Sequence, residues 1–132
     1  MTKLIGKCLC GSVRVSAKGG VTDVEACHCG MCRRQNGGGA YYGVHFSDGV
    51  IFEGESAKWL STSEWGERGF CTNCGSTIGW RRKTARDQAS VSAGLFDDFE
   101  ARVGLHIFTD EGPAYTTIPH DAPHKTSAQA IK

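Results

Sequence analysis

The residues with the clearest chemical potential in this sequence are seven cysteines, which fall into three groups. The groups are Cys8 with Cys10, then Cys27, Cys29 and Cys32, and finally Cys71 with Cys74. Thiolates grouped this closely are typical ligands of Zn²⁺ and other soft ions. The spacing within each group therefore indicates how many metal sites to expect and of which kind.

The first and third groups together predict a closed structural site. Two residues separate Cys71 from Cys74 and Gly75 follows, so a tight turn can aim both sulfurs at one ion. Cys8 and Cys10 are two residues apart, which places both side chains on one face of an extended strand. Four thiolates complete a tetrahedral site and leave no position for a substrate.

The second group predicts a different kind of site, because only Cys27, Cys29 and Cys32 remain. If the backbone is extended, Cys27 and Cys29 face one way and Cys32 returns from the following turn. Three protein ligands with a vacant fourth position are typical of catalytic zinc. His28 would then point to the opposite face, so it is not predicted as a ligand. Spacing leaves two alternatives open: a structural site closed by His28 or another side chain, and redox-active disulfides.

Three thiolates suit sulfur chemistry better than hydrolysis. They make the site anionic and a weak Lewis acid, which favours an external thiol over water as the fourth ligand. Coordination would keep that thiol ionised near neutral pH, ready for carbon–sulfur bond formation or cleavage at a carbonyl carbon. Arg33 and Arg34 follow directly and could grip the carboxylates of a glutathione-like ligand. The alternative is a solvated pair on a helix surface. His28 could be a hydrogen-bond donor, a proton shuttle or an ordinary exposed imidazole.

Composition narrows the class of protein. The chain has 132 residues with a net charge of +1, and 39% of them are hydrophobic, which predicts one soluble domain. No apolar run approaches the roughly 20 residues that cross a bilayer. The near-neutral charge predicts neither a nucleic-acid nor a membrane partner. The odd cysteine count and the lack of an apolar N-terminal segment predict a reducing, cytoplasmic location.

Short runs of alternating polarity predict an all-β domain with minimal helix. The expected strands cover residues 12–16, 21–27, 40–46, 50–52, 57–61, 68–71, 77–81, 89–93 and 103–108. Those at 40–46 and 50–52 flank the turn Ser47-Asp48-Gly49 and predict a hairpin. A short helix is expected at 31–35, ending at Gly37, Gly38 and Gly39. We expect a single domain over residues 1–118 and a polar tail over 119–132.

At these motifs the sequence resembles the glutathione-dependent formaldehyde-activating enzyme family, which includes centromere protein V. The matching segments are CLCGSV at 8–13, CHCGMCRR at 27–34, RGFCTNCGS at 68–76, GLFD at 94–97 and HIF at 106–108. The resemblance implies a small zinc-binding fold of short antiparallel strands, called a β-tent. It also implies two zinc ions per chain, one structural and one near the substrate.

The resemblance implies an activity as well. Members are named for combining glutathione with formaldehyde to give S-hydroxymethylglutathione, a carbon–sulfur lyase reaction, with Cys27, Cys29 and Cys32 at the catalytic ion. The expected partners are therefore a small thiol and a small aldehyde. The rival hypothesis is a non-catalytic zinc module that carries glutathione or mediates protein contacts. A chromatin role, as in centromere protein V, is disfavoured by the near-neutral charge and the lack of a basic tail.

Overall fold

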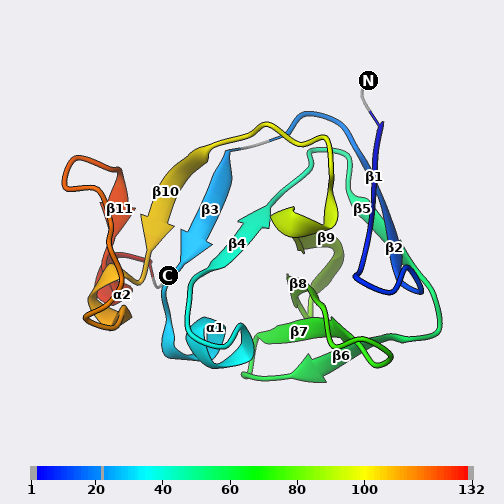
Figure 1. The fold of residues 1–132 in the computed structure, drawn as a ribbon, viewed down its shortest axis with the longest axis horizontal. Coiled ribbons are helices and arrows are strands. Elements are labelled where there is room, and N and C mark those ends of the chain that lie inside the picture. Colours follow the sequence, from blue (N-terminus) through cyan, green and yellow to red (C-terminus); the bar gives the residue numbers. More distant parts are fainter. Residues whose placement is uncertain (1–2, 22, 131–132) are drawn as a thin grey trace. The chain divides into compact units, whose positions relative to one another are not determined.

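The computed structural model describes residues 3–21 and 23–130, and its chain is mostly β-structure (Figure 1). Within this part of the chain there are eleven strands and two short α-helices, which confirms the predicted all-β class. The chain divides into two compact units. Unit 1 comprises Met1–Thr22 and Val44–Glu100, and unit 2 comprises Asp23–Gly43 and Ala101–Lys132.

Unit 1 contains a three-stranded antiparallel sheet in the order β1-β2-β5. Its strands are β1 (Lys3–Lys7), β2 (Arg14–Lys18) and β5 (Val50–Glu53). The alternation expected of a half-buried strand is clear in β2, where Val15 and Ala17 are buried while Arg14 and Lys18 are exposed. One face of this sheet therefore supplies side chains to the core of unit 1.

Four further strands of unit 1 follow one another as an antiparallel meander. They are β6 (Ala57–Ser61), β7 (Gly66–Cys71), β8 (Thr77–Arg82) and β9 (Ala85–Ser92), and each pairs with the next. A 3-10 turn, η1 (Ala93–Leu95), comes after β9. The buried core of the unit is built from Cys8, Val13, Val15, Ala17, Val44, Phe46, Cys71, Ile78, Val91, Leu95 and Phe96.

Unit 2 is organised around β3 (Val24–Cys27) and β10 (Val103–Ile107), which lie side by side and run parallel (Figure 1). On its other edge β3 pairs antiparallel with β4 (Tyr41–Val44), and β10 pairs in parallel with the short β11 (His124–Lys125). Helix α1 (Gly30–Gln35), the 3-10 turn η2 (Thr109–Glu111) and helix α2 (Ser127–Ala130) complete the unit.

Several sequence expectations about elements need correction. The predicted hairpin at 40–52 is wrong, because β4 lies beside β3 whereas β5 pairs with β2. The strand at Lys3–Lys7 was not predicted, and the expected polar tail contains β11 and α2. Thr22, inside one predicted strand, and residues 131–132 of the tail lie outside the described residues. Among the described residues, no helix has both the length and the apolar character needed to cross a membrane.

Candidate metal centres

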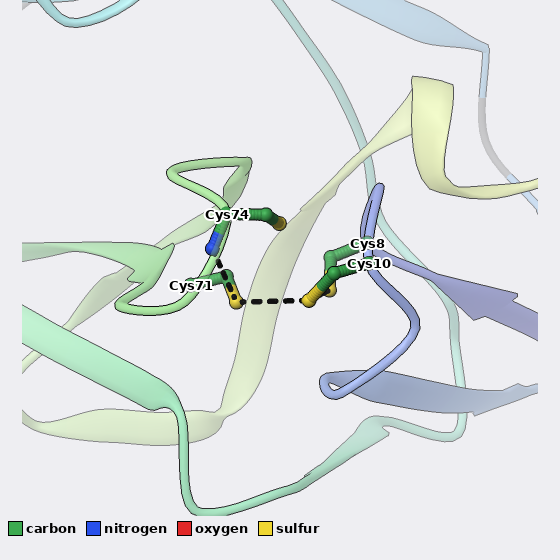
Figure 2. A group of neighbouring side chains, drawn as sticks. All are labelled: Cys8, Cys10, Cys71 and Cys74. Carbon is green, nitrogen blue, oxygen red and sulfur yellow. Dashed lines mark hydrogen bonds between the residues drawn. The ribbon is translucent and has the colours of Figure 1, made fainter.

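Four sulfurs of unit 1 converge into one group, formed by Cys8, Cys10, Cys71 and Cys74 (Figure 2). All four Sγ atoms lie within 4.8 Å of one another. Cys8 Sγ is 3.7 Å from Cys10 Sγ, and Cys10 Sγ is 3.8 Å from Cys71 Sγ. With zinc–sulfur bonds of about 2.3 Å, the edge of a tetrahedron of sulfurs is about 3.8 Å. The distances between the sulfurs therefore fit a tetrahedral zinc site.

Two turns bring these sulfurs together. Cys8 and Cys10 lie in the turn after β1, closed by the Gly11 N–H donating to the Cys8 carbonyl, and not on an extended strand as expected. Cys71 ends β7, and the Gly75 N–H donates to its carbonyl at 2.8 Å. Gly75 has a φ of 81°, in the left-handed region that favours glycine, so the turn predicted from this glycine is present.

Each sulfur of this group has at least one hydrogen-bond donor beside it. Donor and sulfur are 3.0–3.4 Å apart in these contacts. The donors are the backbone N–H groups of Val13 and Cys74, the Asn73 side-chain amide, and the hydroxyls of Ser12 and Ser76. Such donors favour thiolates over thiols, because they stabilise the charged form.

The acidity of these thiols follows their surroundings. The Ser12 hydroxyl, with help from Asn73, lowers the pKa of Cys10 to about 7. The same hydroxyl is the main cause that lowers the pKa of Cys71 to about 5. Burial raises the pKa of Cys8. Two of the four thiols are thus poised to ionise near or below neutral pH, as metal ligands must.

A second group of sulfurs lies in unit 2 and consists of Cys27, Cys29 and Cys32. Their Sγ atoms also lie within 4.8 Å of one another, and Cys29 and Cys32 are buried. Tyr41 and Phe108 pack around this group. The seven cysteines are all free thiols, so neither group is a disulfide centre in this structure.

The second group is held by the junction between β3 and α1. Cys27 is the last residue of β3, and Cys29 is the N-cap of α1. The backbone of Cys29 is extended, as expected for a side chain that faces the same way as Cys27. The Cys32 N–H donates to Cys29 Sγ at 3.4 Å. The Gly30 N–H in the same turn donates to Glu111 Oε1 at 3.0 Å, so a carboxylate fixes the peptide beside the ligand loop.

When three sulfurs lie this close and no cation is near, the neutral thiols are favoured over the negatively charged thiolates. The pKa of Cys27 is raised far above its ordinary value, first by hydrogen bonding with Cys29 and Cys32 and then by burial. A divalent cation would remove this penalty, because it offsets the charges of neighbouring thiolates. The donor set of the second group therefore also fits zinc, and both groups could hold a metal ion.

His28 does not join the second group and is not exposed. Only 4% of its surface is accessible, and its Nε2 lies 2.9 Å from Nδ1 of His106, with the rings stacked. Burial lowers the pKa of both histidines. His106 is itself buried as the partner of His28. The interpretation of His28 as an exposed imidazole is wrong, and the closure of the second group by His28 finds no support in the geometry.

The two arginines after the second group have different surroundings. Arg34 is exposed, and its guanidinium donates to the Gly30 carbonyl at 3.3 Å. Arg33 is half-buried, and its Nε is buried without a hydrogen-bond partner among the residues that the structure describes. An unpartnered buried donor is costly, so the two arginines differ in how well their guanidinium groups are satisfied.

The glycines after α1 form a hydrogen-bonded turn with left-handed backbone conformations. Gly37 and Gly38 have φ values of 78° and 135°, and the Gly38 N–H donates to the Arg33 carbonyl at 2.8 Å. The Tyr115 hydroxyl donates to the Gly38 carbonyl at 2.6 Å. Tyr115, 77 residues farther along the chain than Gly38, therefore stabilises the turn at the end of α1.

The chain is similar to known proteins in sequence and in fold. A family model described as glutathione-dependent formaldehyde-activating enzyme matches residues 3–111. The chain belongs to this family. A protein of Schizosaccharomyces pombe described as an uncharacterized lyase is 26% identical over 100 residues, covering 76% of this chain and 73% of the relative. A crystal structure of a Rhodobacter sphaeroides protein has the same fold, with a TM-score of 0.58 at 17% identity, covering 74% of this chain and 91% of that one.

Sequence reasoning missed the polar residues around the sulfurs. Ser12, Asn73 and Ser76 are close to cysteines in the sequence, but their types alone do not distinguish a ligand neighbour from an ordinary turn residue. Glu111 lies 81 residues from Gly30, so no local pattern could connect the two.

Proposed function

We propose that this protein is a zinc-dependent carbon–sulfur lyase-type enzyme that combines glutathione, or a similar small thiol, with formaldehyde or another small aldehyde. The observation that carries the proposal is the unequal division of the sulfurs, four in unit 1 and three in unit 2, within a family named for this chemistry. Four protein ligands complete a structural site, whereas three leave a position for an exchangeable ligand.

In this proposal Cys8, Cys10, Cys71 and Cys74 hold a structural zinc, and Cys27, Cys29 and Cys32 hold a catalytic one. A zinc ion at the second group would supply the positive charge that keeps an incoming thiol ionised near neutral pH. The reduced thiols that both sites require fit the reducing cytoplasm.

The reaction itself forms one carbon–sulfur bond. The thiolate sulfur attacks the carbonyl carbon of the aldehyde, the carbonyl π electrons become an alkoxide lone pair, and water supplies the proton that gives the S-hydroxyalkyl product. His28 is occupied by His106, so water is the proposed proton source. The chain contributes the cysteines that define the site and an arginine that orients the thiol.

Arg33 is the proposed carboxylate-binding residue, because its Nε is buried without a partner among the described residues, whereas Arg34 donates to Gly30. Changing Arg33 to Ala should weaken binding of glutathione about 10-fold, the cost of one charge-assisted hydrogen bond. Arg34→Ala is the matched control and should change binding less than 3-fold, as measured by calorimetry. Equal effects of the two changes would contradict this assignment.

The separation of roles is tested by Cys29→Ser and Cys74→Ser. The first change should abolish the acceleration of adduct formation over the spontaneous reaction while the circular dichroism spectrum stays folded. The second should unfold the chain, because a structural zinc contributes folding free energy directly. Similar behaviour of both variants would refute the division. Tight glutathione binding by the wild-type protein with no acceleration would identify a carrier in place of an enzyme.

A further inference from the structure

Ser12 has more contacts around the four-cysteine group than its sequence position suggests. Its Oγ lies 3.0 Å from Cys10 Sγ, 3.3 Å from Cys71 Sγ and 2.6 Å from Ser56 Oγ. Cys10 and Cys71 are 61 residues apart in the chain and come from different turns. One hydroxyl therefore bridges the two halves of the group.

Proton counting limits the directions that these hydrogen bonds can take. A metal-bound thiolate has no hydrogen and can only accept, whereas a serine hydroxyl has one hydrogen to donate. The Ser12 hydrogen can therefore serve one sulfur, and Cys10 Sγ at 3.0 Å is nearer than Cys71 Sγ at 3.3 Å. With the hydrogen so placed, the Ser12 oxygen is free to accept from Ser56 at 2.6 Å. Ser56 Oγ itself lies 3.5 Å from Cys71 Sγ, farther than Ser12 does. Donation in the order Ser56 to Ser12 to sulfur therefore gives the shorter contact to a sulfur.

These contacts matter because four thiolates around one divalent cation leave a net charge of −2. The recorded donors to the sulfurs are all neutral: hydroxyls, one side-chain amide and backbone N–H groups. Neutral donors spread the sulfur charge and fix the direction of each ligand. Losing such a partner typically costs 10–100-fold in metal affinity.

We propose that Ser12 is a positioning residue of the four-cysteine group: its one hydrogen is donated to Cys10 Sγ, the nearer of the two sulfurs beside it, and this contact holds that ligand in place and thereby sets the metal affinity of the group. The inference rests on the proposed function only in that the group holds a metal. In this inference the Ser12 hydroxyl orients a ligand sulfur, which the cysteines themselves cannot do.

The test measures metal affinity in the full chain, in a Cys29→Ser background that leaves the second group with two cysteines. Ser12→Ala should bind Zn²⁺ about 10–100-fold more weakly in competition with a chromophoric chelator. Ser12→Thr keeps the hydroxyl and should restore most of the affinity. Ser16→Ala, a half-buried serine on β2 of the same unit, should bind like the background protein.

A spectroscopic signature separates positioning from a general loss of fold. With Co²⁺ as the probe, Ser12→Ala should move the sulfur-to-cobalt charge-transfer band to lower energy while the ligand-field bands remain tetrahedral. Ser56→Ala added to Ser12→Ala should cost little more, because Ser56 acts through Ser12.

Unchanged Zn²⁺ affinity and an unchanged cobalt spectrum in Ser12→Ala would overturn the inference, as would equal weakening by Ala and Thr. If the Cys29→Ser protein itself takes up no Zn²⁺, the metal site proposed above fails, and the inference with it. The two failures are distinguishable, because the first leaves metal binding intact.

Discussion

At the scale of single residues, the carboxylate of Glu67 in unit 1 binds two arginines. Glu67 Oε1 accepts from Arg81 Nε at 2.9 Å and from Arg86 Nε at 3.2 Å, and Oε2 accepts from Arg86. Only 12% of the Glu67 side chain is exposed. The Arg81 guanidinium also lies 3.9 Å from the ring centre of Trp59. Glu67 thus orients an arginine that packs on an aromatic ring.

This arrangement predicts a pH dependence of stability. Arg86 first, and then Arg81, hold the pKa of Glu67 below its ordinary value of 4.5. The folded pKa is the lower one, so the stabilisation is complete above about 4.5 and is lost as the pH falls through the folded value. Glu67→Gln should lower the free energy of unfolding by about 1–2 kcal/mol at pH 7.

The measurement is urea unfolding of the wild-type and Glu67→Gln proteins across the acid range. The difference between their free energies of unfolding should become smaller as the pH falls below 4.5. Glu64→Gln, a change at an exposed position, is the control and should alter stability little. A difference between wild type and Glu67→Gln that stays constant with pH would contradict this account.

Single residues also show where sequence reasoning ends. The spacing within each pair or triplet of cysteines acts locally and indicates which sulfurs a turn can bring together. The joining of Cys8 and Cys10 to Cys71 and Cys74, far along the chain, rests on the four ligands that a tetrahedral site needs. The burial of His28 could not be predicted, since its partner His106 is 78 residues away. The contrast between Arg33 and Arg34 depends on a carbonyl and on burial, neither of which the residue types reveal.

At the scale of elements, the pairing of β8 with β9 leaves no room for a side chain where Gly79 lies opposite Val91. A Cβ atom on Gly79 would clash with the Ser90 carbonyl oxygen and come within 3.4 Å of Phe52 and Trp59. The neighbour that must give way is backbone, which cannot move without disturbing the pairing of the strands. The absence of a side chain at this position is therefore a packing requirement of the sheet.

Gly79→Ala should lower the free energy of unfolding by about 1–3 kcal/mol, the usual cost of overpacking. Gly94→Ala is the matched control, because a Cβ atom there has nothing within 4 Å. Denaturant unfolding of both variants checks the prediction. Equal stabilities would show that β8 and β9 can separate without cost.

The elements themselves were predicted better than their partners. Ala57–Ser61 was predicted with its observed bounds, and α1 begins one residue before the expected helix, because each pattern is local. The pairing of β5 with β2, and the parallel pairing of β3 with β10, join segments far apart in the chain. Alternation in one strand does not specify which strand lies beside it.

At the scale of the whole molecule, each sulfur group belongs to one compact unit. The four-cysteine group joins the turn after β1 to the turn after β7, so a metal there would close a long loop of the chain. The three-cysteine group joins only β3 and α1, which are adjacent in sequence. A metal in the first group would thus contribute more to folding than one in the second group.

The most direct test of this division is a crystal structure of the zinc-loaded protein with glutathione, with anomalous data collected at the zinc edge. We predict two zinc peaks per chain. One should lie among the sulfurs of Cys8, Cys10, Cys71 and Cys74, and the other beside those of Cys27, Cys29 and Cys32, with the glutathione sulfur as its fourth ligand. A single peak, or a second ion fully enclosed by protein side chains, would contradict the account.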